Sequence, residues 1–383
     1  MVERKKIVHV SYYFHPEMGY DINLIGKYHS EEYDYVIITS DILTPWGISA
    51  KEIEEEDRAF EKTNKVKIIR CNSSTPTGRH SVYMKRLRKT IMAEKPSIAF
   101  FHGIEAYTYF HSLLTLPRRI KIFGDTHTLR SQFQDMSFLG KVLYWVFKRL
   151  VVPRINKDPN LFFYTAIENK DILIKDFGMD EHRIHDNEIS VDPHLFYPKD
   201  PDYSLIPGLD GSRLTLGYVG KFDFYKEPHL ILEAISALKL EQKINLVFIG
   251  PRDTKYMEEK WDESGLNKEN ISIFYLDSVK NQDLVNYYAL YDFLVIPRFN
   301  SLSSLDIQAC GKPLIMEKDD TNELRCKEGG LLYDSGSIEE LAGVMRKLLM
   351  EDSLRKKLSE GGQKYVKENY NYISKLRKIE SLY

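Results

Sequence analysis

The residues best placed for chemistry follow an apolar strand expected at residues 214–219. This strand ends at Gly220, and Lys221 and Lys226 come before the next expected helix. A strand that stops at a glycine exposes backbone N–H groups, the following helix presents its positive end, and two ammonium groups add mobile charge. Two lysines at this spacing can hold a diphosphate from two sides. In a later strand, loop and helix, Asp306 stands near the helix start, where an acid commonly binds sugar hydroxyls.

The length and composition of the chain limit the classes of protein to which it can belong. At 383 residues it exceeds a typical domain of roughly 150 residues, and we expect two domains. Charged residues make up 29%, hydrophobic ones 43%, and the formal net charge is −2. These values are typical of a soluble enzyme rather than of a disordered chain or a nucleic-acid-binding protein. We therefore expect no nucleic-acid partner.

The cysteines and the N-terminal sequence indicate a reducing compartment. The three cysteines lack CxxC spacing, which argues against a disulfide framework and against structural zinc. Residues 1–13 hold basic residues and an apolar run only as long as a strand, so they lack the core of a signal peptide. The predicted location is the cytoplasm.

The segment at residues 138–155 is the strongest candidate for membrane contact. Lys141, Lys148 and Arg149 interrupt it, so it falls short of the ~20 apolar residues that a spanning helix requires. Its bulky apolar and basic residues alternate at roughly helical spacing, as in helices that lie on a bilayer. Two interpretations stay open: an amphipathic helix packed on the domain core, or peripheral contact with the cytosolic face of a membrane.

Short apolar runs alternate with helical patterns along both halves of the chain. This alternation predicts a parallel α/β sheet in each half. A stretch rich in proline, glycine and aspartate at residues 192–212 predicts the hinge. We expect an N-terminal domain at residues 1–195, a C-terminal domain at 196–360, and a C-terminal helix at 361–383 that packs back on the N-terminal domain.

Several segments, taken in order, resemble those of retaining GT-B glycosyltransferases of family 4, which use nucleotide sugars. They are VHVSYYFHPEMGYDINLIGKYH near the N-terminus, ISVDPHLFYP between the halves, and GYVGKFDFYKE, NQDLVNYYALYDFLVIP, ACGKPLI and GGLLYDSGSIEELAGVMRKLL in the second half. The resemblance implies two Rossmann-like parallel α/β/α domains that face each other across a cleft. It also implies that the C-terminal domain binds the donor and the N-terminal domain the acceptor.

The resemblance assigns roles to individual residues. Lys221 and Lys226 are expected to neutralise the diphosphate as it leaves, without the metal ion that many transferases use. His127, at the end of an apolar strand, matches the histidine that the family places beside the transferred sugar. His102, at the end of the preceding strand, is an acceptor-side candidate, and Gly19 lets the backbone approach the donor phosphate. For each, the alternative is a structural role as a surface ion pair, a packed histidine or a turn glycine.

The donor is expected to contact loops of the second half. The residues that the resemblance assigns to it are Gly220, Pro251, Val279, Asn300, Ser301 and Asp306. Asp306 corresponds to the second glutamate of the family's glutamate, seven residues, glutamate motif, and is expected to accept hydrogen bonds from ribose hydroxyls; its alternative is a helix cap. The first glutamate is absent. Counting back eight places reaches Arg298, whereas a loop shortened by two residues places Asn300 there.

The leading hypothesis is a retaining glycosyltransferase of polysaccharide biosynthesis. It moves a sugar from a UDP- or GDP-sugar to a hydroxyl of a glycan or lipid-linked acceptor, with no cofactor and no metal. The missing glutamate favours an alternative, a catalytically altered GT-B module that binds a nucleotide or a partner without transfer. A sugar-nucleotide epimerase on the same scaffold is a further alternative. A nicotinamide dehydrogenase is disfavoured, because no GxGxxG opens a helix after the first strand.

Overall fold

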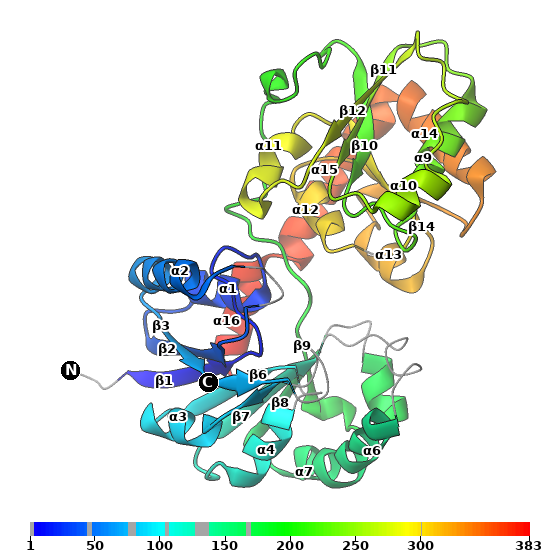
Figure 1. The fold of residues 1–383 in the computed structure, drawn as a ribbon. Helices are drawn as coiled ribbons and strands as arrows, with labels where there is room; N and C mark the ends of the chain where they lie inside the picture. The colour runs from blue at the N-terminus through cyan, green and yellow to red at the C-terminus, as the bar shows by residue number, and fades with distance from the viewer. Residues whose placement is uncertain are drawn as a thin grey trace. The chain divides into compact units, whose positions relative to one another are not determined.

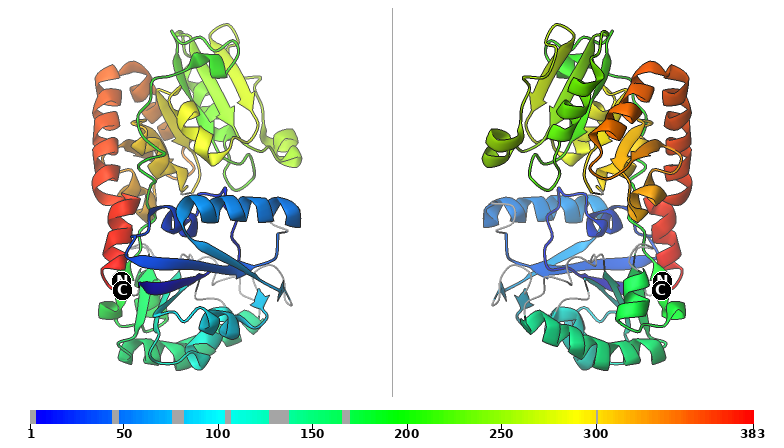
Figure 2. Two further views of the ribbon diagram at one scale, coloured as in Figure 1. Left: turned by 90° about the vertical axis from the view of Figure 1, so that its left-hand side faces the viewer. Right: turned by 90° about the vertical axis from the view of Figure 1, so that its right-hand side faces the viewer.

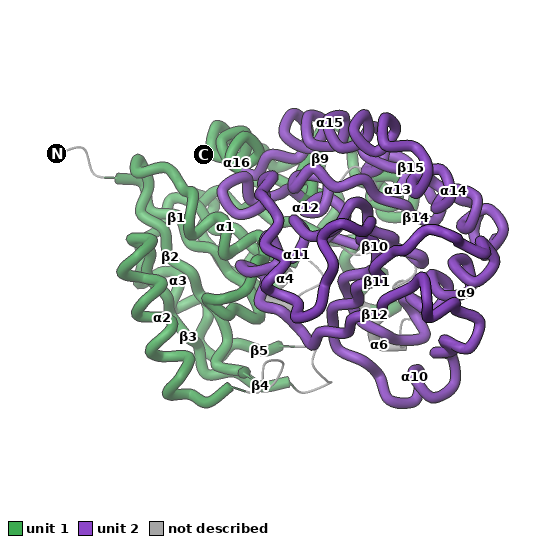
Figure 3. Tube along the Cα trace, turned by 90° about the horizontal axis from the view of Figure 1, so that it is seen from above, with its two compact units in different colours: residues 1–189, 373–383 green, residues 190–372 purple. Residues whose placement is uncertain are grey.

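The computed structural model describes residues 4–43, 48–75, 82–103, 107–126, 138–165, 170–299 and 301–383 (Figure 1). The chain forms two compact units, which Figure 3 colours separately: unit 1 comprises Met1–Ile189 and Ile373–Tyr383, and unit 2 comprises Ser190–Tyr372. The two segments that join the units are paired, since the N–H of Val191 donates to the Tyr370 carbonyl (2.7 Å). The sequence placed these divisions at residues 195/196 and 360/361.

Unit 1 contains a seven-stranded parallel sheet in the order β3-β2-β1-β6-β7-β8-β9. Its strands are β1 (Lys5–Val10), β2 (Tyr33–Ser40), β3 (Lys67–Cys71), β6 (Ile98–His102), β7 (Lys121–Thr126), β8 (Leu161–Thr165) and β9 (Ile184–Asp186). Central strands such as β1 and β6 are buried on both faces and rich in β-branched and aromatic residues, as parallel sheets require. A two-stranded pair, β4 (Ser73–Ser74) and β5 (Tyr83–Met84), lies outside this sheet.

Helices cover both faces of this sheet (Figures 1 and 2). They are α1 (Asp21–Tyr28), α2 (Ala50–Asn64), α3 (Leu87–Ala93), α4 (Tyr107–Thr115), α6 (Phe138–Val146) and α7 (Val152–Lys157), with π-helical turns η1 (Phe147–Val151) and η2 (Ile172–Asp176) and a 3-10 turn η3 (Glu181–Arg183). α2 begins with a capping box, in which Ser49 and Glu52 satisfy each other's backbone N–H groups. α6, η1 and α7 follow one another without a break, so residues 138–157 form one helical segment.

The predicted C-terminal helix consists of two helices, α15 (Asp352–Asn369) and α16 (Tyr372–Glu380). α15 belongs to unit 2, where the hydroxyl of Ser359 donates to the Gly311 carbonyl (2.5 Å). α16, red in Figure 2, packs on unit 1. There the hydroxyl of Tyr35 donates to the carboxylate of Glu380 (2.7 Å), so polar side chains as well as apolar ones hold the helix in place.

Unit 2 contains a six-stranded parallel sheet in the order β12-β11-β10-β13-β14-β15. Its strands are β10 (Leu214–Val219), β11 (Ile244–Ile249), β12 (Ile271–Leu276), β13 (Phe293–Ile296), β14 (Leu314–Glu317) and β15 (Gly330–Tyr333). The helices besides α15 are α9 (His229–Leu238), α10 (Thr254–Lys260), α11 (Leu284–Tyr288), α12 (Ser303–Ala309), α13 (Asp320–Arg325) and α14 (Ile338–Met350), with 3-10 turns η4 (Tyr203–Leu205) and η5 (Asn281–Asp283). The predicted α/β class with two parallel sheets is confirmed.

The described part of the chain contains no helix that is both long enough and apolar enough to cross a bilayer. The three cysteines, Cys71, Cys310 and Cys326, are all buried and form no disulfide.

Candidate functional site

In each sheet, successive strands are added first on one side of the first strand and then on its other side. In unit 2, β10 lies between β11 and β13, so the chain builds outward on one side through β11 and β12 and on the other through β13, β14 and β15. Loops at the carboxyl ends of parallel strands meet at one edge, and such a switch point is where open α/β sheets bind ligands. The loop after β10 holds Gly220, Lys221 and Lys226, and the loop after β13 holds Ser301.

The loop after β10 is joined to the loop after β11 through its backbone. The N–H of Gly220 donates to the Ile249 carbonyl (2.9 Å), and the N–H of Phe222 donates to the Pro251 carbonyl (2.9 Å). A Cβ added at Gly250 would lie 1.8 Å from the carbonyl oxygen of Gly220, so only glycine permits this approach. The N–H of Gly220 is therefore engaged by β11 and does not face a phosphate, and the predicted contact of Gly220 with the donor stays a prediction.

Backbone N–H groups at and just before the beginning of α9 are hydrogen-bonded within unit 2 as well. The N–H of His229 donates to the hydroxyl of Tyr256 (3.0 Å), and Asp223 accepts from the N–H groups of Tyr225 (3.0 Å) and Lys226 (2.8 Å). These backbone donors are satisfied within unit 2. These N–H groups therefore do not face an anion, which would meet the ammonium side chains of the loop.

The two lysines of this loop differ in their surroundings. Lys221 is exposed, whereas Lys226 is half-buried, with its Nζ 5.2 Å from the ring centroid of Tyr225. Burial lowers the pKa of Lys226, Asp223 opposes that shift, and the positive charge of Lys221 adds to it. An ammonium group that has lost part of its water gains more from pairing with an anion than a fully hydrated one. This arrangement suits a ligand with two negative phosphates.

An ion-pair network joins the loop after β13 to the loop after β10. Arg298 Nε lies 2.8 Å from Oε2 of Glu227, and Arg298 Nη1 lies 2.5 Å from Oε1 of Glu317. Beside it, the rings of Tyr225 and Phe299 stack with centroids 4.2 Å apart and planes 11° apart. Phe299 has a φ of 54°, a left-handed conformation that costs a non-glycine residue about 1–3 kcal/mol and that surrounding contacts must hold. The network thus places the two loops side by side.

Asp306 lies in the first turn of α12, where the residue as a whole is half-buried. Burial, and to a smaller extent the charge of Asp192, raise the pKa of Asp306 to about 8. At neutral pH the carboxyl group therefore carries a proton and can donate as well as accept a hydrogen bond. Leu302 is the N-cap of α12, which excludes the alternative that Asp306 caps this helix. Ser301, in the preceding loop, shares a hydrogen bond with Ser303 (Oγ–Oγ 2.7 Å).

The other predicted donor contacts fall along the same edge of the sheet. Gly220, Pro251 and Val279 follow the neighbouring parallel strands β10, β11 and β12. Pro251 is exposed and Val279 is half-buried. Asn300 lies outside the described residues, so its predicted contact with the donor sugar stays a prediction.

In unit 1 the switch point lies between β1 and β6. Gly19 is exposed in the loop after β1, and His102 is the last residue of β6. His102 Nδ1 lies 2.9 Å from Oδ2 of Asp125, and His102 Nε2 lies 3.0 Å from Nδ1 of His9. The second carboxylate oxygen of Asp125 accepts from the N–H of Gly103 (2.9 Å). A carboxylate and two imidazoles therefore form one chain across β1, β6 and β7.

The protonation of this chain follows from its burial. Burial lowers the pKa of His9 well below its ordinary value, and the neighbouring His102 lowers it further, so His9 is neutral. One hydrogen lies between Nε2 of His102 and Nδ1 of His9, and which nitrogen carries it is set by the tautomers of the two rings. Both ring nitrogens of His102 are then engaged within unit 1. This geometry argues against direct contact between His102 and an acceptor; His102 instead holds Asp125, two residues before His127, which lies outside the described residues.

One group of side chains among the described residues comes within the spacing of metal ligands: Asp21, His102 and Asp125, with ligand atoms within 4.8 Å of one another. The Nζ of Lys375 lies 2.5 Å from Oδ1 of Asp21, and Asp125 already binds His102. Both carboxylates are therefore engaged within unit 1, Asp21 by an ammonium group and Asp125 by an imidazole. The expected absence of a metal ion stays a prediction.

Three features of the site were missed from the sequence. Gly250 gave a signal, because a glycine directly after an apolar strand and before a proline marks a tight turn. His9 gave a weaker one, a lone histidine inside an apolar strand. Arg298 was noted only for the glutamate it replaces, and its ion pairs with Glu227 and Glu317 join residues far apart in the sequence.

Comparison with known sequences finds a family match in the second half of the chain. Residues 202–365 match the family described as glycosyl transferases group 1. Two curated relatives are D-inositol 3-phosphate glycosyltransferases, from Corynebacterium urealyticum (25% identical over 191 residues) and Stackebrandtia nassauensis (23% over 205 residues). These alignments cover 46% and 50% of this chain and 44% and 46% of the relatives. The chain thus spans less than half the length of the curated relatives it matches.

Comparison with solved structures extends over the whole chain. Sucrose-phosphate synthase from Thermosynechococcus elongatus has a TM-score of 0.73 at 16% identity, covering 99% of this chain and 98% of that one. Anabaena Alr3699/HepE, solved in complex with UDP and glucose, has a TM-score of 0.69 at 13% identity, covering 99% of each chain. The GT-B fold that the sequence resemblance implied is confirmed.

Proposed function

We propose that the protein is a retaining glycosyltransferase, a proposal supported by the match of residues 202–365 to the glycosyl transferases group 1 family. It moves a sugar from a UDP- or GDP-sugar to a hydroxyl of a glycan or lipid-linked acceptor. The bond between the anomeric carbon and the diphosphate breaks, and the acceptor oxygen bonds to that carbon on the same face. The departing phosphate oxygen helps to take the proton of the acceptor hydroxyl.

The observation that carries this proposal is the pair of loops at the switch point of unit 2. Arg298 joins the loop that holds Lys221 and Lys226 to the loop that leads into Ser301 and α12. An ammonium pair suited to a diphosphate and hydroxyl and carboxyl groups suited to a sugar or a ribose thus follow two neighbouring strands, β10 and β13. Such an edge is where α/β sheets bind nucleotides.

In the proposed mechanism, the lysines stabilise charge that develops on the leaving diphosphate. The negative charge on the bridging oxygen grows as the sugar departs, and a fixed cation is worth most at that moment. Lys226, partly stripped of water, is the stronger candidate for this contact. Because ammonium groups supply the charge, we propose that transfer is metal-independent and survives an excess of chelator. His127 beside the transferred sugar belongs to the same proposal.

The donor and acceptor classes draw support from the comparisons. The Anabaena neighbour was solved with UDP and with UDP-glucose, and the curated relatives carry the name D-inositol 3-phosphate glycosyltransferase. These names support a nucleotide-sugar donor and a hydroxyl acceptor for this chain. We propose that the reaction takes place in the cytoplasm, on a glycan or lipid-linked acceptor of polysaccharide biosynthesis.

The test is nucleotide release from a panel of UDP- and GDP-sugars, with and without a mixture of glycan and lipid-linked acceptors. Lys226→Ala should lower kcat for the preferred donor by about 10²–10³ while the circular dichroism spectrum stays unchanged. Lys255→Ala is the matched control, since Lys255 is exposed on α10 and forms an exposed ion pair with Glu259 (3.7 Å). Turnover of Lys226→Ala within twofold of the wild type would overturn the role of this lysine.

A second candidate is a GT-B module that binds a nucleotide without transferring a sugar. Arg298 favours it, because counting back from Asp306 places this residue where the family has a glutamate, and its guanidinium is committed to Glu227 and Glu317. This candidate predicts that a nucleoside diphosphate binds to the wild-type protein although no donor in the panel releases nucleotide. Release from any single donor in the presence of an acceptor would exclude it.

A further inference from the structure

The helical segment from Phe138 to Lys157 is strongly basic in an acidic chain. It contains Lys141, Lys148, Arg149, Arg154 and Lys157 and no aspartate or glutamate, whereas the whole chain has a formal net charge of −2. Cationic attraction to an anionic surface is therefore a property of this segment and not of the protein as a whole.

Large apolar side chains on this segment face solvent. Phe147, Val151 and Ile155 form its buried face, at the spacing of one side of a helix. On the other side, Trp145 is 59% exposed, Leu150 63% and Val142 40%. We call this outward set, together with the basic residues beside it, the basic–aromatic face; it comprises Lys141, Val142, Trp145, Lys148, Arg149 and Leu150. The amphipathic helix that the sequence left as one alternative thus packs on the core and still exposes an apolar stripe.

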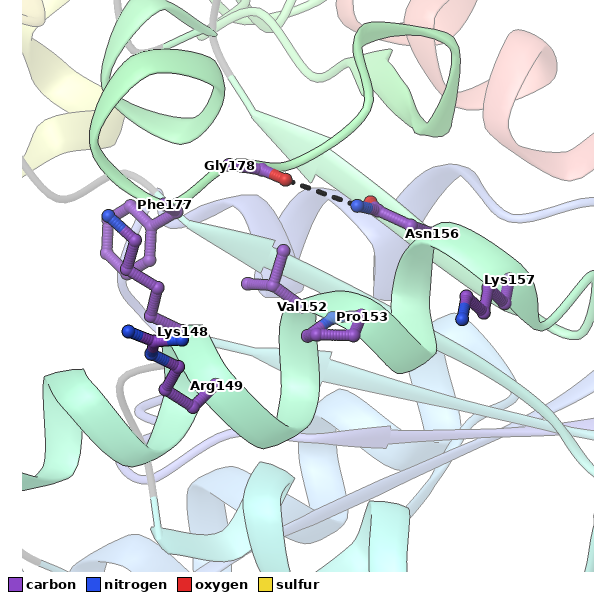
Figure 4. Close-up of a pocket in the computed structure, with 8 residues that line it drawn as sticks. All are labelled: Lys148, Arg149, Val152, Pro153, Asn156, Lys157, Phe177 and Gly178. Carbon is purple, nitrogen blue, oxygen red and sulfur yellow. Dashed lines mark hydrogen bonds between the residues drawn. The ribbon is translucent and has the colours of Figure 1, made fainter.

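A hollow of about 380 Å³ opens where this face meets the turn after η2 (Figure 4). The residues that line it are Lys148, Arg149, Val152, Pro153, Asn156, Lys157, Phe177 and Gly178. Asn156 is engaged, since its amide donates to the Gly178 carbonyl (3.2 Å) and its oxygen accepts from the N–H of Asp180 (2.9 Å). Its polar atoms therefore hold the wall of the hollow together, and the cationic groups are left to bind an incoming anion.

The cations of this hollow keep capacity for a ligand. Lys148 donates one N–H to the carbonyl of Asp176 (2.6 Å), which fixes its stem and leaves further donors on its ammonium group. Among the described residues, no carboxylate forms an ion pair with Arg149 or Lys157. A phosphate is the group that a guanidinium and two ammonium groups bind best.

We propose that the basic–aromatic face docks the protein on a bilayer that carries anionic phospholipids, with a lipid phosphate in the hollow. Trp145 and Leu150 enter the headgroup boundary, where an amphipathic ring is favoured, while the cations meet the negative surface. Because the segment is positively charged, it should bind an anionic bilayer more tightly than a neutral one. Because its exposed residues are also apolar, it should bind a bilayer more tightly than a soluble anion. The inference does not depend on sugar transfer and is measured without any donor.

The experiment is co-sedimentation of the full chain with two kinds of vesicle, phosphatidylcholine alone and phosphatidylcholine with about one third phosphatidylglycerol. We expect binding to the anionic vesicles only, weakened by added salt. Arg149→Gln with Lys157→Gln should weaken it about thirtyfold, since each basic residue near an anionic surface contributes roughly a fivefold gain. The matched control is Lys51→Gln with Lys62→Gln, which removes two exposed lysines from α2 and should leave vesicle binding unchanged.

A second readout tests whether the face enters the lipid. Tryptophan emission should shift to the blue on anionic vesicles, and this shift should disappear in Trp145→Phe. Leu150→Ala should weaken vesicle binding several-fold, whereas Met350→Ala, a substitution of a residue 71% exposed in unit 2, should not. Equal binding of wild type and Arg149→Gln/Lys157→Gln, or full competition by soluble glycerol phosphate, would overturn the proposal. Absence of binding to the anionic vesicles would also overturn it.

Discussion

Removal of Arg298 is the sharpest test of how the two loops of unit 2 are held together. Arg298→Met keeps the length and apolar stem of the side chain but removes the cation that lies between Glu227 and Glu317. The Glu317 side chain is only 7% exposed, whereas those of Arg298 and Glu227 are each 27% exposed. The substitution therefore leaves one nearly buried carboxylate without its cation and one carboxylate that water can reach.

The size of the effect follows from these exposures. Breaking a fully buried ion pair by removing one partner costs about 3–5 kcal/mol, and an exposed pair contributes about 0–1 kcal/mol. Because the Arg298 network lies between these limits, we expect Arg298→Met to lower the free energy of unfolding of unit 2 by about 2–3 kcal/mol. For a unit of this size that corresponds to a fall in Tm of about 5–10 °C.

Thermal unfolding of three variants measures this. Arg252→Met is the matched control, since Arg252 lies 2.8 Å from Asp277 in an ion pair whose side chains are 36% and 90% exposed; it should change Tm by no more than about 2 °C. The double variant Arg298→Met/Glu317→Gln should recover part of the lost stability, because it also removes the unpaired carboxylate. If Arg298→Met and Arg252→Met unfold at the same temperature, the network does not hold the loops.

Two further predictions concern the same unit. Gly250→Ala should lower the free energy of unfolding, measured in urea, by about 3 kcal/mol or more, because the added Cβ would lie 1.8 Å from the carbonyl oxygen of Gly220. The control Gly343→Ala, which has open space around it in α14, should be neutral or stabilising. Equal free energies of unfolding for the two variants would refute the close approach at Gly250. Burial raises the pKa of Asp306 from its ordinary value of 3.8 to about 8. Between these values the native state binds one more proton than the unfolded state, so the free energy of unfolding falls as the pH rises from about 4 to about 8, by up to about 1.4 kcal/mol per pH unit, and levels off above that. Asp306→Asn should remove this fall. If the free energies of unfolding of the wild type and Asp306→Asn differ by a constant amount from pH 5 to pH 9, the pKa of Asp306 is not raised in the folded protein.

The two sheets could be predicted from the sequence because buried parallel strands read as continuous apolar runs. The apolar runs of the first half correspond to β1, β2, β3, β6, β7 and β8, and those of the second half to the strands of unit 2. β9 was missed because its three residues, Ile184–Asp186, are too few to form a pattern. The π-helical turn Phe147–Val151 was also missed, since nothing in its residue types distinguishes it from an α-helix.

Candidate site residues could be singled out from the sequence, whereas most of their contacts could not. Lys221, Lys226 and Asp306 were chosen as candidates because strand, loop and helix follow one another in a recognisable order. The sequence did not reveal that β11 takes the N–H of Gly220, because that depends on the register between two strands. It did not reveal that His9 engages His102 either, since their contact requires β1 and β6 to be neighbours.

The boundary between the units could be placed only approximately. Proline, glycine and aspartate at residues 192–212 indicated a linker, but the pairing of Val191 with the segment around Asn371 decides where the chain leaves each unit. That pairing joins residues at opposite ends of unit 2. Local composition carries no information about such a contact.

The central claim is that the ammonium groups after β10 hold a diphosphate, and calorimetric titration tests it most directly. UDP or GDP should bind the wild-type protein at least tenfold more tightly than the corresponding monophosphate, because the second phosphate meets Lys226. In Lys226→Ala this preference should collapse while monophosphate affinity stays within about twofold. Equal affinity of the wild-type protein for diphosphate and monophosphate, or an unchanged preference in Lys226→Ala, would contradict the account.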